Sequence, residues 1–548
     1  MTSPMNRRNN IRRLREEEFD LCIIGGGASG AGCAFDAALR GLKVALIEKT
    51  DFAAETSSKS TKLIHGGVRY LEQAFRKFDF DQLRQVRHGL EERHILLQQA
   101  PHLARPLALI TPVFSAWAGL YYSIGLKLYD WFASGRDTLP GSRWLSKKEA
   151  RSRVPGLTDK VHSAVLYYDG QLDDARYCLT LVVSAAEAGA VVANHIELES
   201  FEKSETGVLN TAIASDQLDG GAEVRIRAKV FLNCTGPFSD RLRSLANAGL
   251  PSRIRPSKGV HVVLPHEILG GNDALLIPKT KDGRVVFAIP FEGKLLLGTT
   301  DRDCNEIDRE PLLEATEVDF LLDTLQPFLS DKLNKNMLLA GFGGLRPLIA
   351  AVGGETKSLL RDHEVEHDPE SNLLSLLGGK WTTYRLMAKD AVDAVCKLLS
   401  IPVECSTQSR LLAGAEDYDA GFWKKIQANY GLDADISQHL AFKYGTRANR
   451  VAELAKAQPA LRERILSEQP FIKAEIIYAV REEMACTPRD FLARRIRLEI
   501  TGWQAAGAAS EVVATLMGTE LGWREDKVRE EMRYYQTLLD RFRESATG

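Results

Sequence analysis

The first strongly apolar segment of the chain is Asp20-Leu21-Cys22-Ile23-Ile24, which runs directly into a cluster of glycines. A short apolar run bounded by turn residues predicts a strand that is buried in a parallel sheet. A helix is expected over residues 31–39, ending at Gly41, and a second apolar strand over 43–47. The succession of strand, helix and strand predicts a βαβ unit at the start of the fold.

Apolar strands and helical segments continue to alternate further along the chain. A helix and a strand are expected over residues 179–193, and a second strand over 230–234 that ends in the turn Thr235-Gly236-Pro237. From Lys258 to about Thr300, short strands alternate with Gly and Asp turns without long helices, which predicts an antiparallel sheet. The pattern of strand, glycine turn and helix then returns over residues 376–399.

The chain after Pro402 has a different character, because it is helical, charged and rich in alanine to its end. Residues 401–548 are therefore expected to form a separate C-terminal α-helical domain. Helix breaks are expected near Gly431, Pro459, Pro470, Pro488 and Gly502.

Charge and length narrow the choice of function. The 548 residues carry a formal net charge of −2 with both signs well mixed, which argues against nucleic-acid binding. This length predicts two or three domains. Arginines cluster between Arg7 and Arg15, and we expect residues 1–17 to form a flexible, solvated basic arm. Contact of this arm with anionic lipid is the alternative.

The glycine cluster after the first strand has the spacing of a dinucleotide-binding turn. Gly25 allows a tight turn, Gly27 allows backbone to approach a pyrophosphate, and Gly30 lets the helix pack against the strand. Glu48 ends the second strand, where a carboxylate can accept hydrogen bonds from both ribose hydroxyls. Glu48 disfavours a 2′-phosphate and thus NADP, but the motif alone does not separate NAD from FAD.

Metal and membrane signals are weak. The eight cysteines include no C-x-x-C pair, and several lie in apolar runs, so we expect reduced core thiols and no metal site. No window is long and apolar enough for a membrane-spanning helix, and no signal peptide is expected. The segment 117–132 is rich in aromatic residues and poor in charge, which is typical of a helix in a bilayer interface or of a buried helix.

Several longer motifs carry a family resemblance. GGGASG at residues 25–30 is followed by SSKSTKLIHGGVRYLE at 57–72, and further along the chain stand NCTGPFSD, GTTD, GLRPL and GGKWTTYR. In this order the motifs resemble those of the FAD-dependent glycerol-3-phosphate dehydrogenases, from Phe19 to about Tyr535. The long second motif is highly specific, whereas GGGxxG and GTTD would be weak alone.

The resemblance implies an α/β plus α fold of the D-amino-acid-oxidase/glutathione-reductase-like superfamily. Residues 18–400 would form the FAD-dependent oxidoreductase region, followed by the helical domain over 401–548. The Rossmann-like FAD-binding domain would comprise about 18–95, 165–255 and 340–400. An antiparallel-sheet substrate domain would comprise about 96–164 and 256–339.

The resemblance also implies a reaction, the oxidation of sn-glycerol 3-phosphate to dihydroxyacetone phosphate by hydride transfer from C2 to FAD N5. His65 is our candidate for the base, because imidazole accepts a proton near neutral pH. Arginine suits a phosphate clamp because its planar fork donates two hydrogen bonds at once. Arg346 and Lys380 are the further catalytic candidates, and either would stabilise the anionic reduced flavin. Substrate-binding candidates are Arg69, Tyr70, Arg361, Thr300 with Thr299, and His261.

Residues expected to bind the cofactor come from the same motifs. They are Gly25, Gly27, Ser29, Gly30, Glu48, Ser57, Ser58, Lys62, Leu63, Gly66, Thr235, Gly236, Gly343, Gly379, Lys380, Thr382 and Thr383.

The family also implies where the electrons go. Ubiquinone or menaquinone is the expected acceptor, and the segment 117–132 becomes a candidate monotopic anchor on the membrane surface. The expected location is the cytoplasmic face of a bacterial inner membrane, with peripheral attachment, and a homodimer is a further option.

Three alternatives stay open. Glycerol-3-phosphate oxidases pass the electrons to O2 and form H2O2. An FAD-dependent amine or amino-acid oxidase would share the FAD turn but should lack an arginine clamp for phosphate. A non-enzymatic FAD-containing scaffold is the third alternative, and the lack of a basic stripe argues against one that binds RNA.

Overall fold

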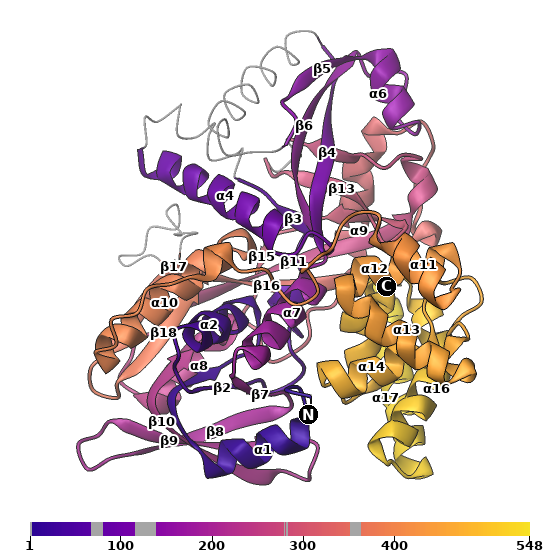
Figure 1. Cartoon of the computed structure of the whole chain (residues 1–548). Coiled ribbons are helices and arrows are strands. Elements are labelled where there is room, and N and C mark those ends of the chain that lie inside the picture. The colour runs from indigo at the N-terminus through magenta and orange to yellow at the C-terminus, as the bar shows by residue number, and fades with distance from the viewer. Residues whose placement is uncertain (1–2, 67–79, 116–138, 279, 281–282, 351–362) are drawn as a thin grey trace.

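The computed structural model describes residues 3–66, 80–115, 139–278, 280, 283–350 and 363–548. Two β-sheets form the body of the molecule, and a helical C-terminal domain packs beside them (Figure 1). Where the chain is described, one sheet has eight strands and the other has ten. The expected combination of a Rossmann-like domain, a mainly antiparallel domain and a helical domain is thus confirmed.

The eight-stranded sheet, here the cofactor sheet, has the order β17-β18-β10-β1-β2-β7, with β8 and β9 attached through β10. Its central pairs, β18 with β10, β10 with β1, β1 with β2 and β2 with β7, are parallel. The strands are β1 (Glu18–Ile24), β2 (Val44–Ile47), β7 (Val191–Ala193), β8 (Ile196–Lys203), β9 (Leu209–Asp216), β10 (Ala222–Asn233), β17 (His363–Asp368) and β18 (Leu373–Gly378).

Both faces of the cofactor sheet are covered, as the continuous apolar run of β1 predicts. Leu21 and Ile23 pack into the core beneath α2 (Ala28–Leu39), α7 (Asp174–Glu187) and α10 (Tyr384–Leu399). Cys22 and Ile24 point to the opposite face, toward α8 (Ser239–Ala246) and the N-terminal segment. Because side chains alternate along a strand, one short run supplies both cores.

The N-terminal segment is the clearest departure from expectation. Our prediction of a flexible basic arm over residues 1–17 is wrong, because α1 (Arg7–Glu16) is a helix that packs on one face of the cofactor sheet, in contact with β7 and β10. Ile11 and Leu14 are buried against the sheet, and Arg7 pairs with Asp216 at 2.6 Å. Burial of two apolar side chains and a nearly buried ion pair hold the segment in place.

The ten-stranded sheet, here the substrate sheet, is antiparallel apart from the pair β12 with β4. The expected antiparallel stretch from Lys258 to Thr300 forms β11 to β14. The sheet also contains β3, β6 and β16, which fall in segments predicted to belong to the FAD-binding domain, so the predicted domain boundaries differ from the structure here. The strands are β3 (Leu63–Ile64), β4 (Ala104–Val113), β5 (Arg143–Ser146), β6 (Ser163–Leu172), β11 (Ile254–Pro265), β12 (Ala274–Ile277), β13 (Val286–Phe291), β14 (Lys294–Gly298), β15 (Arg302–Asp303) and β16 (Ala340–Ile349).

Helices at the edges of the substrate sheet are α4 (Phe80–Gln99), α6 (Lys147–Arg153) and α9 (Ala315–Leu325). The C-terminal domain contains α11 (Phe422–Tyr430), α12 (Ala434–Tyr444), α13 (Ala448–Ala457), α14 (Lys473–Glu483), the π-helical turn η10 (Asp490–Arg495), α15 (Leu498–Thr501), α16 (Trp503–Leu521) and α17 (Glu525–Thr547).

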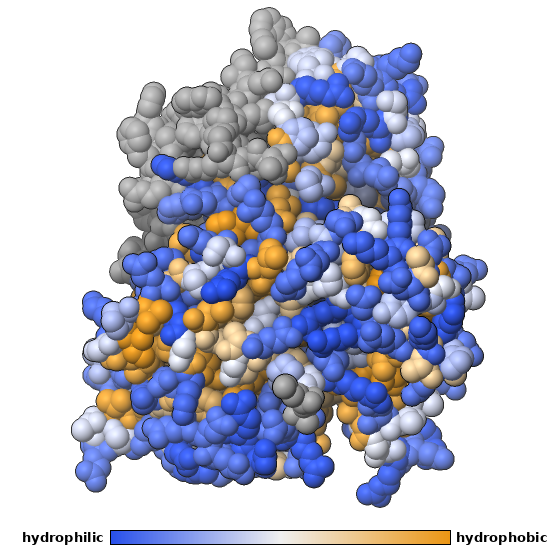
Figure 2. All heavy atoms as spheres, in the orientation of Figure 1, coloured by the Kyte–Doolittle hydropathy of each residue, from blue (hydrophilic) through white to orange (hydrophobic). Residues whose placement is uncertain are grey.

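The C-terminal domain is attached to the substrate sheet through a shared core. Trp503, Val513 and Leu539 belong to the same buried cluster as Val262 and Leu297 of the sheet. Within the described ranges, no helix combines the length and the apolar character that crossing a bilayer requires. On the face seen in Figure 2, hydrophilic residues cover most of the surface and hydrophobic residues show in patches between them.

Candidate functional site

An open pocket lies at the carboxyl ends of the parallel strands β1, β10 and β18, and the space within it, including its solvent-filled mouth, is about 1340 Å³. Ligands of doubly wound sheets bind at this edge. Its walls come from the turn after β1, the end of β2, the loop 54–57, the start of β8, the turn after β10 and the turn after β18.

The turn after β1 lines the pocket with the backbone of Gly25 and Gly27. Gly25 has φ +109, and a Cβ at this position would lie 2.6 Å from the carbonyl oxygen of Cys234. Gly27 is the N-cap of α2 and has no side-chain cap, so the helix amino terminus faces the pocket through backbone. The hydroxyl of Ser57 accepts a hydrogen bond from the amide of Ala28 at 2.9 Å. This geometry fits the pyrophosphate of a dinucleotide.

Glu48, which directly follows β2, is hydrogen-bonded to this turn. Glu48 accepts hydrogen bonds from the backbone amides of Gly26 at 2.7 Å and Thr50 at 3.0 Å. Burial raises the pKa of the Glu48 carboxyl. Lys49 lies over the ring of Phe238 at 4.1 Å, and both line the pocket. Glu48 is therefore held at the position where a ribose would bind.

The turn after β18 closes another part of the pocket. Gly379 has φ +91, and a Cβ there would lie 2.3 Å from the side chain of Met387. Lys380 follows and lines the pocket, and the indole N–H of Trp381 donates to the carbonyl of Ser57 at 2.9 Å. The residues that line the pocket thus fit FAD, with glycine backbone, a carboxylate and a lysine placed around one space.

Strand register places a second group of residues on one face of the substrate sheet. In the pair β11 with β16, Ser257 is opposite Arg346 and His261 is opposite Phe342. The intervening positions on this face are both glycine: Gly259 lies under the Arg346 guanidinium, and Gly344 lies under the Cβ and carbonyl of Lys59. The two glycines make room for an arginine and for the loop that leads to β3.

Arg346 is oriented by the GTTD turn. Its Nη2 donates to the Thr299 hydroxyl and to the Thr300 carbonyl, each at 3.1 Å, and its Nη1 lies 3.1 Å from Asp301. The hydroxyl of Thr300 accepts from the amide of Val260 at 3.1 Å and donates to buried Glu317 at 3.3 Å. The hydroxyl of Thr300 is therefore engaged inside the protein, and its contact with a substrate stays a prediction.

His261 is buried on the same face. Its ring stacks on Phe342 with centroids 4.9 Å apart, and Nε2 lies 3.0 Å from the hydroxyl of Thr61. Burial, together with the nearby charges of Lys62 and Arg346, holds the pKa of His261 well below its ordinary value. The imidazole is consequently neutral at physiological pH.

The structure brings many of the expected residues together at the pocket. Those that line it are Gly25, Gly27, Ser29, Glu48, Ser57, Thr235, Gly236, Gly379 and Lys380. Arg346 precedes Pro347, which also lines it, and His65 is half-buried directly after β3.

Other expected residues lie behind the pocket wall. Gly30 packs α2 against the turn, since a Cβ there would meet the Gly25 carbonyl at 1.9 Å. Lys62 pairs with Asp174 at 2.7 Å in the protein interior. Cofactor contacts stay a prediction for Ser58, Lys62, Leu63, Gly66, Gly343, Thr382 and Thr383. Arg69, Tyr70, Arg361 and the segment 117–132 lie outside the described residues.

Some pocket residues carry no local sequence signal. Ile196, Leu198, Phe238 and Leu242 form an apolar part of the wall, and they belong to β8 and to the segment after β10. The alternation of β8 could have suggested a half-buried strand, but not that its start faces a ligand.

Among the described residues, His195, Cys486 and Asp490 form a group with the spacing of metal ligands. The Asp490 carboxylate already lies 3.0 Å from His195 Nε2 and accepts hydrogen bonds from the amides of Cys486 at 2.9 Å and Thr487 at 3.0 Å. These contacts are those of a buried helix cap.

Comparison with known proteins gives a consistent result. The model of the FAD dependent oxidoreductase family matches residues 20–393, and the model of the C-terminal domain of alpha-glycerophosphate oxidase matches residues 405–528. The probable mitochondrial glycerol-3-phosphate dehydrogenase of Caenorhabditis elegans is 41% identical over 535 residues, which cover 96% of this chain and 73% of that protein. The human mitochondrial glycerol-3-phosphate dehydrogenase is 40% identical over 559 residues, which cover 98% of this chain and 76% of that protein.

A solved structure agrees over the whole length. The glycerol-3-phosphate dehydrogenase from Bacillus halodurans, complexed with FAD, has a TM-score of 0.81 and 29% identity, covering 100% of this chain and 99% of that chain. The expected cofactor, FAD, and the expected enzyme class, an FAD-dependent oxidoreductase, are confirmed.

Proposed function

The chain belongs to the family of FAD-dependent glycerol-3-phosphate dehydrogenases, and on this premise we propose that it oxidises sn-glycerol 3-phosphate to dihydroxyacetone phosphate and passes the electrons to a membrane quinone. The observation that carries the proposal is the position of Arg346. Arg346, whose guanidinium is oriented by the GTTD turn, directly precedes pocket-lining Pro347 in β16, and Lys380 lines the pocket itself. We infer that these two cations serve an anionic substrate.

The chemistry of the side chains indicates which of them bind the substrate. Arg346 binds the phosphate dianion or the oxygen at C2, because its fork is already oriented by Thr299, Thr300 and Asp301. FAD, when bound, supplies the acceptor for the C2 hydride. From the family resemblance, Arg69, Arg361 and Tyr70 complete the substrate site.

The proton of the C2 hydroxyl needs an acceptor, and we assign this role to His65. His261 is the nearest alternative, since burial keeps it neutral and its Nε2 lies 3.0 Å from the Thr61 hydroxyl. Lys380 is the third candidate. Separate His65→Asn and His261→Asn variants distinguish the first two, because loss of the base lowers kcat and removes its limb from the pH profile.

We further propose that the final acceptor is ubiquinone or menaquinone and that the enzyme attaches peripherally to the cytoplasmic face of a bacterial inner membrane. A homodimer is a further option. The family resemblance and the aromatic composition of residues 117–132 support this proposal.

A specific observation favours a second candidate function. The C-terminal domain matches a family model described from alpha-glycerophosphate oxidase. In an oxidase the electrons pass to O2, and H2O2 forms with each turnover. Parallel assays of peroxide formation and of quinone reduction distinguish the two acceptors.

The first experiment is anaerobic addition of sn-glycerol 3-phosphate to the FAD-loaded protein. We expect the visible absorbance of the flavin to bleach, and Arg346→Met to need a much higher substrate concentration for the same bleaching. Glycerol, which lacks the phosphate, is the matched control. Bleaching by glycine and none by glycerol 3-phosphate would replace the proposal with an amine-oxidase function.

A further inference from the structure

One loop connects the cofactor pocket to the C-terminal domain. We define the pocket loop as residues 51–62, between β2 and β3. Its residues 54–57 line the FAD pocket. Ser57 also fixes the first turn of α2, because its hydroxyl accepts from the amide of Ala28 at 2.9 Å. The conformation of the pocket loop therefore determines the shape of the phosphate-binding turn.

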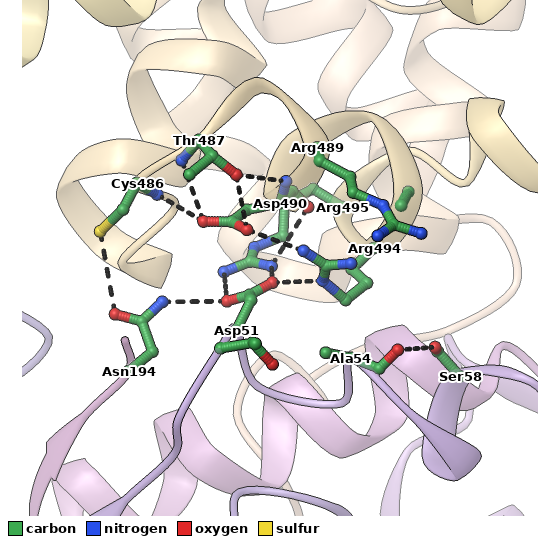
Figure 3. A network of polar contacts seen from close by, with 12 residues as sticks. Asp51, Ala54, Ser58, Asn194, Cys486, Thr487, Arg489, Asp490, Arg494 and Arg495 are labelled. Carbon is green, nitrogen blue, oxygen red and sulfur yellow. Dashed lines mark hydrogen bonds and ion pairs between the residues drawn. The ribbon is translucent and has the colours of Figure 1, made fainter. Parts of the chain in front are cut away.

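The N-terminal end of the pocket loop, at Asp51, is bound by two arginines of the C-terminal domain (Figure 3). Asp51 is buried and accepts hydrogen bonds from Arg494 Nε at 2.5 Å and from both terminal nitrogens of Arg495. Asn194 donates a further hydrogen bond to the same carboxylate at 3.0 Å. A carboxylate inside the protein is stable only with partners of this kind.

The C-terminal half of the pocket loop is bound by a third arginine, Arg497. The carbonyl of Ser58 accepts from Arg497 Nη2 at 2.8 Å and from Lys62 Nζ at 2.7 Å. Both cations also bind Asp174, at 2.9 Å and 2.7 Å. Arg497 and Asp174 are fully buried. The carbonyl next to pocket-lining Ser57 is thus bound to a side chain of the C-terminal domain.

Local structure explains why the three arginines reach one loop. Residues 490–495 form a π-helical turn, and Arg497 has a left-handed φ of +65. Asp490 caps this turn, because it accepts from the amides of Cys486 and Thr487 and from Arg494 Nη2 at 2.7 Å. Such wide turns inside helical segments are common at functional sites.

We propose that Arg494, Arg495 and Arg497 are positioning residues for FAD, so that the C-terminal domain completes the cofactor site without lining it. Loss of one arginine removes a charged donor from the buried Asp51 carboxylate or from the buried side of the Ser58 carbonyl. The pocket loop then relaxes, and Ser57 no longer fixes the turn at α2. The proposal concerns retention of FAD, so it stands whether or not glycerol 3-phosphate is the substrate.

The test compares FAD binding by purified apoprotein variants, followed by quenching of flavin fluorescence and by the visible spectrum of the bound flavin. Arg497→Met and Asp51→Asn should each raise the Kd for FAD by about tenfold or more. The spectrum of the bound flavin should shift as well, because residues 54–57 of the loop line the pocket. A wild-type Kd and spectrum in both variants would overturn the proposal.

Arg447→Met is the matched control. Arg447 of the C-terminal domain pairs with Glu187 at the end of α7, whereas Arg494, Arg495 and Arg497 bind the pocket loop. The variant should lower thermal stability without changing the Kd for FAD. An equal loss of FAD affinity in Arg447→Met would show that interface stability alone matters, and the proposal would fail.

A measurement on the unmodified holoprotein covers the case in which the variants do not fold. Hydrogen exchange in increasing urea reports opening of residues 490–501, and flavin fluorescence reports release of FAD. We expect release to begin at the urea concentration at which this segment opens. Retention of FAD after the segment has opened would overturn the proposal.

Discussion

The guanidinium of Arg346 occupies the space directly over Gly259, where an added Cβ would lie 2.3 Å from Nη2. The two residues belong to neighbouring antiparallel strands, and Ser257 stands opposite Arg346. Glycine at position 259 therefore sets the position of the arginine as directly as the hydrogen bonds that Arg346 donates to the GTTD turn.

Gly259→Ala should displace the Arg346 guanidinium while leaving the sheet intact, because the added methyl meets the mobile end of a side chain. We expect KM for glycerol 3-phosphate to rise by about tenfold, the effect of weakening one charged hydrogen bond, with unchanged FAD affinity. Steady-state kinetics and an FAD titration check this. Gly507→Ala on α16 meets its neighbours no closer than 3.4 Å and serves as the control. An unchanged KM in Gly259→Ala would exclude Arg346 as a substrate ligand.

Glu48→Ala should weaken FAD binding. The variant removes the acceptor of the Gly26 amide, which lies 2.7 Å from Glu48 Oε2, and the expected acceptor of the ribose hydroxyls. We expect the Kd for FAD to rise by about tenfold to a hundredfold, measured by titration of apoprotein. Asp20→Ala is the matched control, because the Asp20 carboxylate also accepts a hydrogen bond from a backbone amide, that of Lys43 at 2.9 Å. If both variants bind FAD like the wild type, the ribose role of Glu48 is wrong.

Lys62 should make stability depend on pH. Burial lowers the pKa of Lys62 from 10.5 to about 7, against the opposing effect of Asp174. The unfolded chain therefore binds more protons than the folded protein between pH 7 and 10.5, so the free energy of unfolding rises with pH in this window. The slope due to Lys62 is at most about 1.4 kcal/mol per pH unit.

Urea unfolding at several pH values in this window measures the slope. In Lys62→Met the free energy of unfolding should increase less with pH than in the wild type, even if this variant is less stable at every pH. Lys59→Met should retain the wild-type slope, since the carboxylates of Glu55 and Glu310 outweigh burial and raise the pKa of Lys59. Equal slopes in all three proteins would mean that Lys62 stays charged up to its ordinary pKa.

Charging the aromatic segment should separate membrane coupling from flavin chemistry. Leu120 and Trp131 lie outside the described residues, so this prediction rests on composition alone. Leu120→Glu combined with Trp131→Glu should release the protein from membranes without detergent. Reduction of quinone in vesicles should fall more than reduction of a soluble dye. Equal loss of both activities would exclude a purely interfacial role for residues 117–132.

The parts of the site that were predictable are local in sequence. Gly25, Gly27 and Glu48 belong to one βαβ unit, in which strand, turn, helix and strand follow directly, so spacing alone indicates their positions. The motif around Ser57 was assigned through family resemblance, and the structure places Ser57 in the pocket. The succession of short strands and Gly or Asp turns, without long helices, likewise indicated the antiparallel strands β11 to β14.

The parts that could not be predicted depend on distant partners. In α1 the buried apolar residues are only Ile11 and Leu14, a pattern too weak to predict a docked helix. The ion pair that Arg7 adds is made with Asp216, which is distant in sequence. The sequence Arg494-Arg495-Ile496-Arg497 is typical of a solvated helix face. Its burial follows from carboxylates at positions 51 and 174, whose proximity exists only in the folded protein.

The cofactor sheet has a consequence for synthesis on the ribosome. Strand β18 lies two places from β1 in the sheet, but it is translated only after the whole substrate sheet has been made. Because β18 leads into the turn that carries Lys380, a nascent chain has no complete nucleotide cleft until late in elongation. Flavin loading is therefore expected to be a late or post-translational event, and cells short of riboflavin should accumulate a full-length, colourless protein.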